Sequence, residues 1–180
     1  MNTKKINVGL SVSSLENAIK ELKQIRSNIR NINREFIRES LLWIQNQANM
    51  YLETRVNNFP NSANIAMEWD IKLIKDGRGG NFAYELRNKS DVAYFVEFGT
   101  GVKGESKKHK VADKVGYKYD VNNHGEDGWS FAFEYKDEMY YFKGFRGYEG
   151  KSFLYDAFFD FYYLNEWKKI YQKVYDKYIK

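Results

Sequence analysis

The sequence predicts an α+β fold in which a long N-terminal helix packs on an antiparallel β-sheet and a C-terminal helix completes the chain. Three observations predict it. Apolar residues recur every three or four positions through the first part of the chain, alternation and glycine-rich turns replace that pattern in the middle, and an aromatic-rich helical pattern returns at the end. A chain of 180 residues fits one domain over 1–180.

The first predicted element is a helix over residues 13–56. Ser13 and Glu16 fit a capping box at its start, and the segment 57–61, which holds the single proline, ends it. After Phe36 the apolar stripe moves to another face, so the helix either kinks or changes partners there. The first stripe contains Leu15, Ala18, Ile19, Leu22, Ile25, Ile29, Ile32 and Phe36, and the second Ile37, Leu41, Ile44, Ala48 and Tyr51.

Residues 65–143 are predicted to be mainly antiparallel sheet. A glycine-rich loop at 76–80 joins two expected strands at 65–75 and 82–87. A short helix at 92–98 ends at Gly99 and Gly101. Residues 102–114 are expected to form a polar, basic loop. Further strands are expected at 115–121, 129–135 and 138–143, with a tight turn at 136–137.

A helix over 152–178 closes the chain after a glycine-rich turn at 145–151, with Ser152 as its expected N-cap. Aromatic residues make up 18% of the sequence, which favours strands, interfaces or both. The sheet–helix core is expected to contain Tyr94, Phe95, Phe98, Trp129, Phe131 and Phe133.

Composition excludes several kinds of protein. The absence of cysteine rules out disulfides and thiolate metal sites. No apolar run approaches the roughly 20 residues of a membrane helix, and the N-terminal ten residues lack the apolar region of a signal peptide. The formal charge of +5 is too small to argue for nucleic acid by itself.

The catalytic inventory is thin, and we expect neither an enzyme nor a cofactor or metal. His109 lies among lysines, which disfavour metal binding. His124, near Asp120, Glu126 and Asp127, superficially resembles a metal or nuclease site, but a turn has the same composition for conformational reasons. Glu97 lies in a short apolar helix, where it is expected to cap a turn or pair with a basic residue.

The predicted N-terminal helix carries opposite charges on its two flanks. Such a helix can be exposed to solvent, with charge pairs between residues three or four positions apart. It can also pack beside copies of itself in a ring. Alternatively, its basic flank can face DNA phosphates. The basic flank contains Lys23, Arg26, Arg30, Arg34 and Arg38, and the acidic flank Glu21, Glu35 and Glu39.

Two runs, DVAYFVEFGTG at 91–101 and YDVNNHGEDGW at 119–129, follow the long helix and precede a glycine-to-aromatic helix start, GKSFLYDA at 150–157. In this order they resemble the tail-completion (minor tail, neck or head–tail joining) proteins of long-tailed bacteriophages and prophage tail particles. The residues that match are Tyr94, Val96, Glu97, Phe98, Gly99, Thr100, Gly101, Asp120, Val121, Asn122, His124, Gly125, Glu126, Gly128 and Trp129. The chain departs from the family's pattern after Pro60 and at Ser152, where the family has proline.

The resemblance implies a non-enzymatic virion subunit that forms a hexameric ring at the head-proximal end of a tail. Its implied partners are itself, tail-tube or terminator and neck proteins, and DNA in the lumen, with no membrane. It would be assembled in the cytoplasm of a bacterial host. The alternatives are a DNA-binding protein that uses the basic helix flank and the 103–114 loop, and a nuclease that depends on His124.

Overall fold

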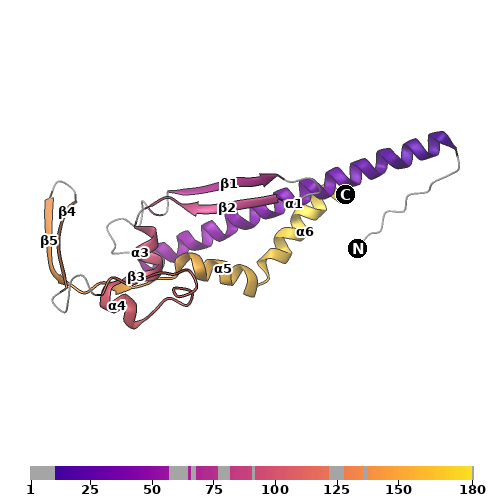
Figure 1. Ribbon diagram of the computed structural model, residues 1–180. Coiled ribbons are helices and arrows are strands. Elements are labelled where there is room, and N and C mark those ends of the chain that lie inside the picture. Colours follow the sequence, from indigo (N-terminus) through magenta and orange to yellow (C-terminus); the bar gives the residue numbers. More distant parts are fainter. Residues whose placement is uncertain are drawn as a thin grey trace.

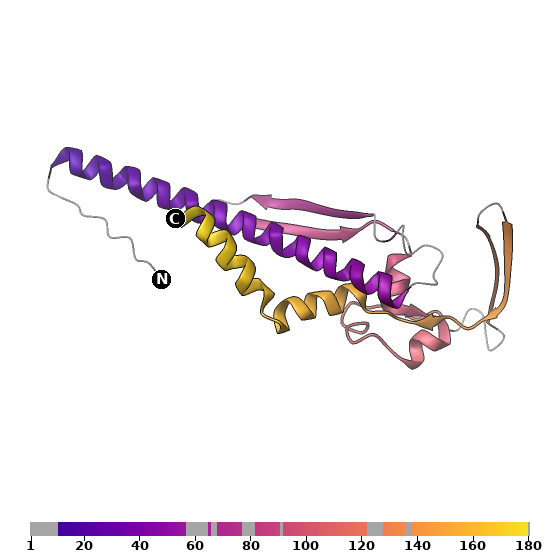
Figure 2. The same cartoon turned by 180° about the vertical axis from the view of Figure 1, so that it is seen from behind.

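The computed structural model describes residues 11–56, 65, 68–76, 82–90, 92–121, 128–135 and 138–179. The fold is α+β, as predicted. Helix α1 forms the long axis of the molecule, with the β1–β2 hairpin along one side and helices α5 and α6 along another (Figure 1). The view from behind shows the same arrangement, with the β4–β5 hairpin at the end of the molecule farthest from the start of α1 (Figure 2).

Helix α1 runs without interruption over Val12–Arg55. It begins earlier than predicted, because Ser11 and not Ser13 is the N-cap: the Ser11 hydroxyl accepts the Ser14 N–H at 3.2 Å. This bond satisfies one of the donors that the first helical turn leaves free. The expected capping box at Ser13 and Glu16 is therefore wrong, because the N-cap lies two residues earlier.

Helix α1 changes partners along its length instead of kinking. Near its middle, Phe36 meets Tyr171 of α6 edge-on at 5.4 Å between ring centroids, whereas its last turns pack on α5. The main core lies at this second contact, around Leu52, Val96 and Phe153, each almost fully buried. Its members are Ile44, Ala48, Leu52, Val56, Ile65, Ala93, Val96, Phe153, Ala157 and Phe161.

The strands form three separate two-stranded antiparallel sheets, where one sheet was expected. Strands β1 (Trp69–Asp76) and β2 (Phe82–Asn88) pair as a hairpin, as do β4 (Trp129–Tyr135) and β5 (Glu138–Phe145). The third sheet pairs β3 (Gly99–Thr100) with β6 (Tyr148–Glu149). Each long pair is a hairpin whose strands bond to each other across a short connection, and the outer edges of both hairpins stay unpaired with other described strands. β1 also starts later than the expected 65, and the loops at 76–80 and 136–137 lie mostly outside the described residues.

The segment between the short helix and β4 differs from prediction. Helix α3 (Ala93–Phe98) is present as expected, but a second short helix, α4 (Gly101–Ser106), opens the predicted polar loop. Residues 115–121 are a turn and irregular backbone, not a strand. The reason is that Gly116 has a φ of 70°, which breaks an extended chain, and that Tyr117 packs on Phe98 of α3 while Tyr119 packs on Tyr117.

The C-terminal helix is divided in two. Helix α5 (Phe153–Tyr163) and helix α6 (Glu166–Ile179) meet at a turn in which Asn165 has a φ of 57°. Asparagine tolerates this left-handed conformation better than most residues. Ser152 is the N-cap residue of α5, as expected, but its side chain makes no capping bond. The expected aromatic core is also wrong in part: Phe98 is buried, but Tyr94 and Phe95 are about half exposed.

Candidate functional site

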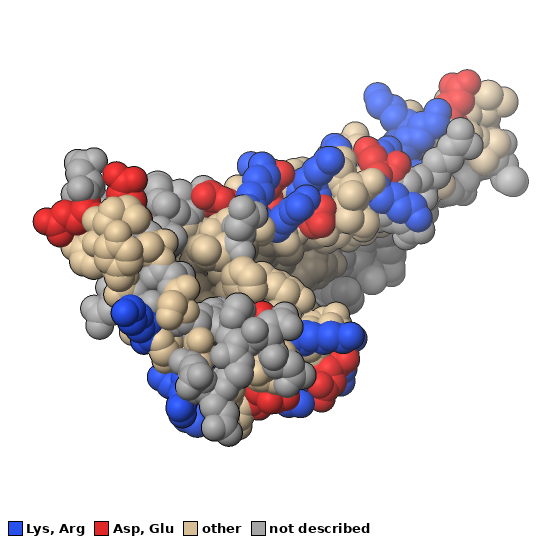
Figure 3. Space-filling view, turned by 60° about the vertical axis from the view of Figure 1, so that its left-hand side comes forward, with Lys and Arg blue, Asp and Glu red and all other residues tan. Residues whose placement is uncertain are grey.

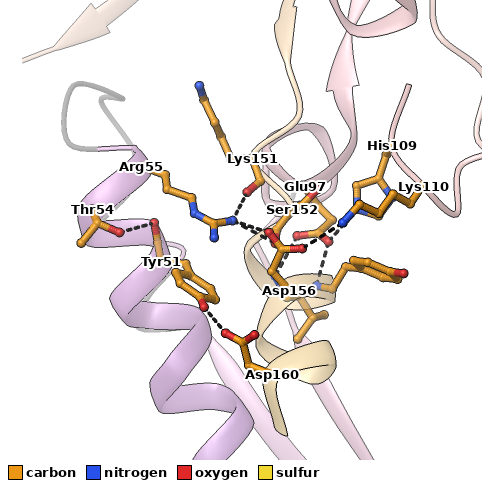
Figure 4. Close-up of polar contacts among 12 residues, drawn as sticks. Tyr51, Thr54, Arg55, Glu97, His109, Lys110, Lys151, Ser152, Asp156 and Asp160 are labelled. Atoms are coloured by element: carbon orange, nitrogen blue, oxygen red, sulfur yellow. Dashed lines mark hydrogen bonds and ion pairs between the residues drawn. The ribbon is translucent and has the colours of Figure 1, made fainter. Parts of the chain in front are cut away.

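The Glu97 cluster is the most organised polar site in the described structure (Figure 4). Glu97 lies in α3 with its side chain buried. One carboxylate oxygen accepts the Leu154 N–H at 2.8 Å, and the other accepts the Tyr155 N–H at 2.9 Å. These are free donors of the first turn of α5, so Glu97 caps that helix from another part of the chain. The expectation that Glu97 caps a turn is confirmed.

His109 faces the same carboxylate. Its Nε2 lies 3.2 Å from Glu97 Oε1, with side-chain exposures of 1% and 9%, although the two groups are not aligned as a hydrogen bond. His109 Nδ1 accepts the Val111 N–H at 3.3 Å, which leaves the ring proton on Nε2, toward Glu97. The basic-loop context had hidden this role, since sequence reasoning placed His109 among exposed lysines.

Stacked rings hold the His109 segment against α3. Phe98 stacks on Tyr117 at 4.7 Å between ring centroids and lies 4.7 Å from the His109 ring. Tyr117 donates to the Gly99 carbonyl at 2.5 Å, and the Tyr119 hydroxyl accepts the His109 N–H at 2.8 Å. Burial raises the pKa of Tyr117 to about 12, so its hydroxyl stays protonated and keeps donating at neutral pH.

Arg55 fastens the end of α1 to the start of α5. Its guanidinium donates to the Lys151 carbonyl at 2.8 Å and to the Asp156 carboxylate at 2.7 Å, and it lies over the Tyr51 ring. One turn further on, the Tyr51 hydroxyl donates to Asp160, a hydrogen bond that raises the pKa of Tyr51. These contacts and Glu97 together fix α5 relative to both α1 and α3 (Figure 4).

Glu97 and His109 are residue types that can act as an acid–base pair, but here they connect α3 to the first turn of α5. Burial raises the pKa of Glu97, and the Leu154 and Tyr155 amides with His109 oppose that rise. Both carboxylate oxygens are occupied, and neither side chain is open to a substrate. Among the described residues, no group of three or more histidine, aspartate or glutamate side chains is placed to hold a metal ion. The geometry therefore supports a structural role.

Glycines next to the β3–β6 pair allow the two backbones to lie close together. Gly99, at φ 86°, would place a Cβ 2.5 Å from the Gly150 nitrogen, and a Cβ on Gly147 would lie 1.9 Å from the Thr100 carbonyl oxygen. Both distances are shorter than any ordinary contact, so only glycine fits. The run Tyr94–Gly101 thus contacts β6, the His109 segment and the start of α5.

The second signature run is only partly described. Asn122, His124 and Gly125 lie outside the described residues, so the structure does not test the alternative interpretation of a nuclease or metal site there. Asp120 is exposed. Gly128 packs at the base of the β4–β5 hairpin, where a Cβ would lie 2.8 Å from the Gly144 backbone, and Trp129 begins β4.

The charges on α1 are divided between internal pairs and free surface. Arg30 and Arg34 bind the two oxygens of Asp76 in β1, at 2.6 and 3.5 Å. Glu35 accepts from Lys177 and Tyr178 of α6, and these bonds lower its pKa. Glu21, Arg26 and Arg38 are exposed and Glu39 is half-buried. In the space-filling view both signs of charge alternate along the molecule (Figure 3).

Two groups of exposed apolar side chains lie on the long helices, in addition to exposed residues elsewhere such as Met139, Tyr140 and Tyr141 of β5. The α1 seam consists of Leu15, Ile19, Leu22 and Ile29, which are 49–56% exposed. The aromatic shelf is formed by the end of α5 and the turn after it, and consists of Phe158, Phe159, Tyr162, Tyr163 and Leu164. Single exposed apolar residues are ordinary, but contiguous ones mark interaction surfaces.

No helix in the described part of the chain has the length and apolar character needed to cross a membrane. Comparisons with protein-family models, with curated proteins and with solved structures found no match.

Proposed function

We propose that this chain is a structural, non-enzymatic subunit of a bacteriophage tail or tail-like particle, which forms a ring in the tail-completion or neck region. The proposal starts from the resemblance of the two signature runs. Its structural support is that the first run, residues 94–101, joins other elements: Glu97 caps α5, and Gly99 and Thr100 pair with β6.

The exposed α1 seam is the single observation that carries the proposal. The start of α1 extends beyond the C-terminal end of α6, and the four residues of the seam are about half exposed there (Figures 1 and 2). Burying apolar surface contributes about 25 cal/mol per Å², which favours contact with another protein. The aromatic shelf lies elsewhere on the molecule, so each subunit has two different apolar surfaces, as a closed ring requires.

DNA binding is the second candidate. The 103–114 segment carries five lysines, all of them exposed, and such a segment can bind phosphates. Against it, Lys107 pairs with Glu149 at 2.7 Å, and Arg30 and Arg34 of the helix flank are bound to Asp76. These pairs reduce the positive charge available to DNA.

The test is the mass of the purified protein by light scattering, with and without DNA and over a range of salt, together with negative-stain electron microscopy. We expect a ring-shaped oligomer whose mass does not depend on DNA. A monomer that binds DNA tightly, and loses that binding as salt rises, would contradict the ring and favour the second candidate.

A further inference from the structure

The α1 seam belongs to a longer apolar stripe over residues 15–36 that has the spacing of a coiled coil, with Ile19 beside it at position e. Leu15, Leu22, Ile29 and Phe36 are seven residues apart and occupy the first apolar position, a, of a heptad; Ala18, Ile25 and Ile32 occupy the second, d. The b, c and f positions between Glu16 and Arg34 are all polar or charged. A repeat of seven keeps one face of a helix toward a neighbouring helix over its whole length.

The C-terminal part of this stripe already packs against α6 inside the molecule. Helix α6 covers Phe36, through its edge-on contact with Tyr171, and Asn28 donates to the Tyr178 carbonyl at 3.1 Å near the end of α6. Ile32, between these contacts, is buried. The same heptad continues past the last residue of α6, where Leu15, Leu22 and Ile29 are about half exposed, Ile25 is half-buried and Ala18 is buried. The seam is therefore a helix-packing surface that lacks its partner over residues 12–29.

The charges beside the seam identify the partner. Glu21 is at position g and Arg26 at position e of the next heptad, which are the two positions that pair between parallel, in-register helices. Within one helix the two side chains cannot pair, because residues five positions apart point about 140° away from each other around the helix axis. Neither has an oppositely charged residue three or four positions away. A second copy of this chain supplies the matching charge.

We propose that residues 12–29 of α1 form a parallel, in-register bundle with the same residues of further copies of this chain. The seam residues also select the number of helices: leucine at a with isoleucine at d, as at Leu22 and Ile25, favours more than two strands. This inference rests on the proposed function and deepens it, because cyclic symmetry about an axis along α1 places every copy of the helix parallel to the others.

The bundle does not have to fold by itself. Eighteen residues only slightly exceed the roughly 12–15 below which an isolated helix is marginal in water even for alanine-rich sequences, but α1 is already helical here because it continues from the folded core. Association then costs little ordering of backbone.

The first test compares Leu22→Gln with Lys20→Gln. Leu22 is at a seam position and 56% exposed, whereas Lys20 is exposed at an outer position of the same helix. Both changes leave the monomer's core untouched. We expect Leu22→Gln to raise the concentration needed for assembly on the order of tenfold or more, with unchanged circular dichroism, and Lys20→Gln to have no effect. Equal masses for the two variants would overturn the inference.

The second test measures orientation. The chain has no cysteine, so Leu22→Cys introduces a single thiol that faces its own copy only in a parallel, in-register bundle. We expect oxidation to give covalent dimers with Leu22→Cys and not with Lys20→Cys. Separately, Glu21→Arg and Arg26→Glu should each weaken assembly, and the combined exchange should restore it. Rings that form without any cross-link at Leu22→Cys would overturn the bundle and leave the ring proposal standing. Cross-linked bundles that form no rings would support the bundle and contradict the ring proposal.

Discussion

Glu97 combines two interactions that usually occur apart, a helix cap and a contact with a buried histidine. Its carboxylate satisfies the Leu154 and Tyr155 amides while facing His109. Since buried donors without acceptors cost roughly 1–3 kcal/mol each, this side chain stabilises the joint between α3 and α5. The cost of keeping a charge there is the desolvation that raises its pKa.

That raised pKa makes a prediction about pH. A carboxyl that is more basic in the folded protein contributes its full stability below its ordinary pKa of 4.5 and loses it as the pH rises through the raised value. Wild type should therefore lose unfolding free energy relative to Glu97→Gln over this window. Urea denaturation at a series of pH values measures the difference.

The groups that face Glu97 must be separated in that experiment. His109 and Asp156 both act on its pKa, and Lys110 lies 4.0 Å from Asp156. Repeating the series with His109→Gln removes the histidine's own titration, and Glu105→Gln, an exposed glutamate of α4, is the matched control. A difference between wild type and Glu97→Gln that stays constant with pH would show that the prediction is wrong.

At the scale of elements, the short β3–β6 pair depends on glycine. We predict that Gly147→Ala destabilises the protein more than Gly116→Ala. Both residues have positive φ, 82° and 70°, but only at Gly147 would a Cβ meet backbone, the Thr100 carbonyl oxygen, while the space beside Gly116 is open. Gly116→Ala should cost about 1–2 kcal/mol of backbone strain alone. Equal losses of unfolding free energy in urea would mean that the two strands separate easily.

Elements with local signals were predictable from the sequence. Helix α1, helix α3 and the two long hairpins each follow from apolar spacing and turn residues within a few positions. The break between α5 and α6 was not, because the aromatic pattern continues through Asn165 and only the packing of both helices on α1 requires the turn. The β3–β6 pair was missed for a similar reason, since strands of two residues have no periodicity.

The candidate site divides in the same way. That Glu97 caps a turn followed from its position in a short apolar helix, but its partners lie more than fifty positions away along the chain. His109 was missed because lysines surround it in sequence while aromatic rings surround it in space. A buried histidine has no sequence signal when its neighbours come from other elements.

For the whole molecule, we predict that the β4–β5 hairpin is independent of the core. The main core is built from α1, α3, α5 and Ile65, and the hairpin projects away from it (Figure 2). Joining Gly128 to Phe145 by a short turn in place of the hairpin should change the stability of the remaining protein by no more than about 1 kcal/mol.

Thermal unfolding followed by circular dichroism measures this change, with the intact chain as the reference. Gly128 already packs against the Gly144 and Phe145 backbone, so the new turn closes without moving the ends. A large fall in the melting temperature would show that the hairpin contributes to the core after all.

Helix α1 also sets a length and a rotation. Its 44 residues extend about 66 Å, and because it is unbroken, the core at one end fixes the direction in which the seam points at the other. Seven residues added between the two would move the seam outward by about 10 Å and turn it by only about 20°, whereas two added residues would turn it by about 160° toward the opposite side. The number of residues in α1 therefore determines both the distance from the core at which the seam meets neighbouring molecules and the direction in which it faces them.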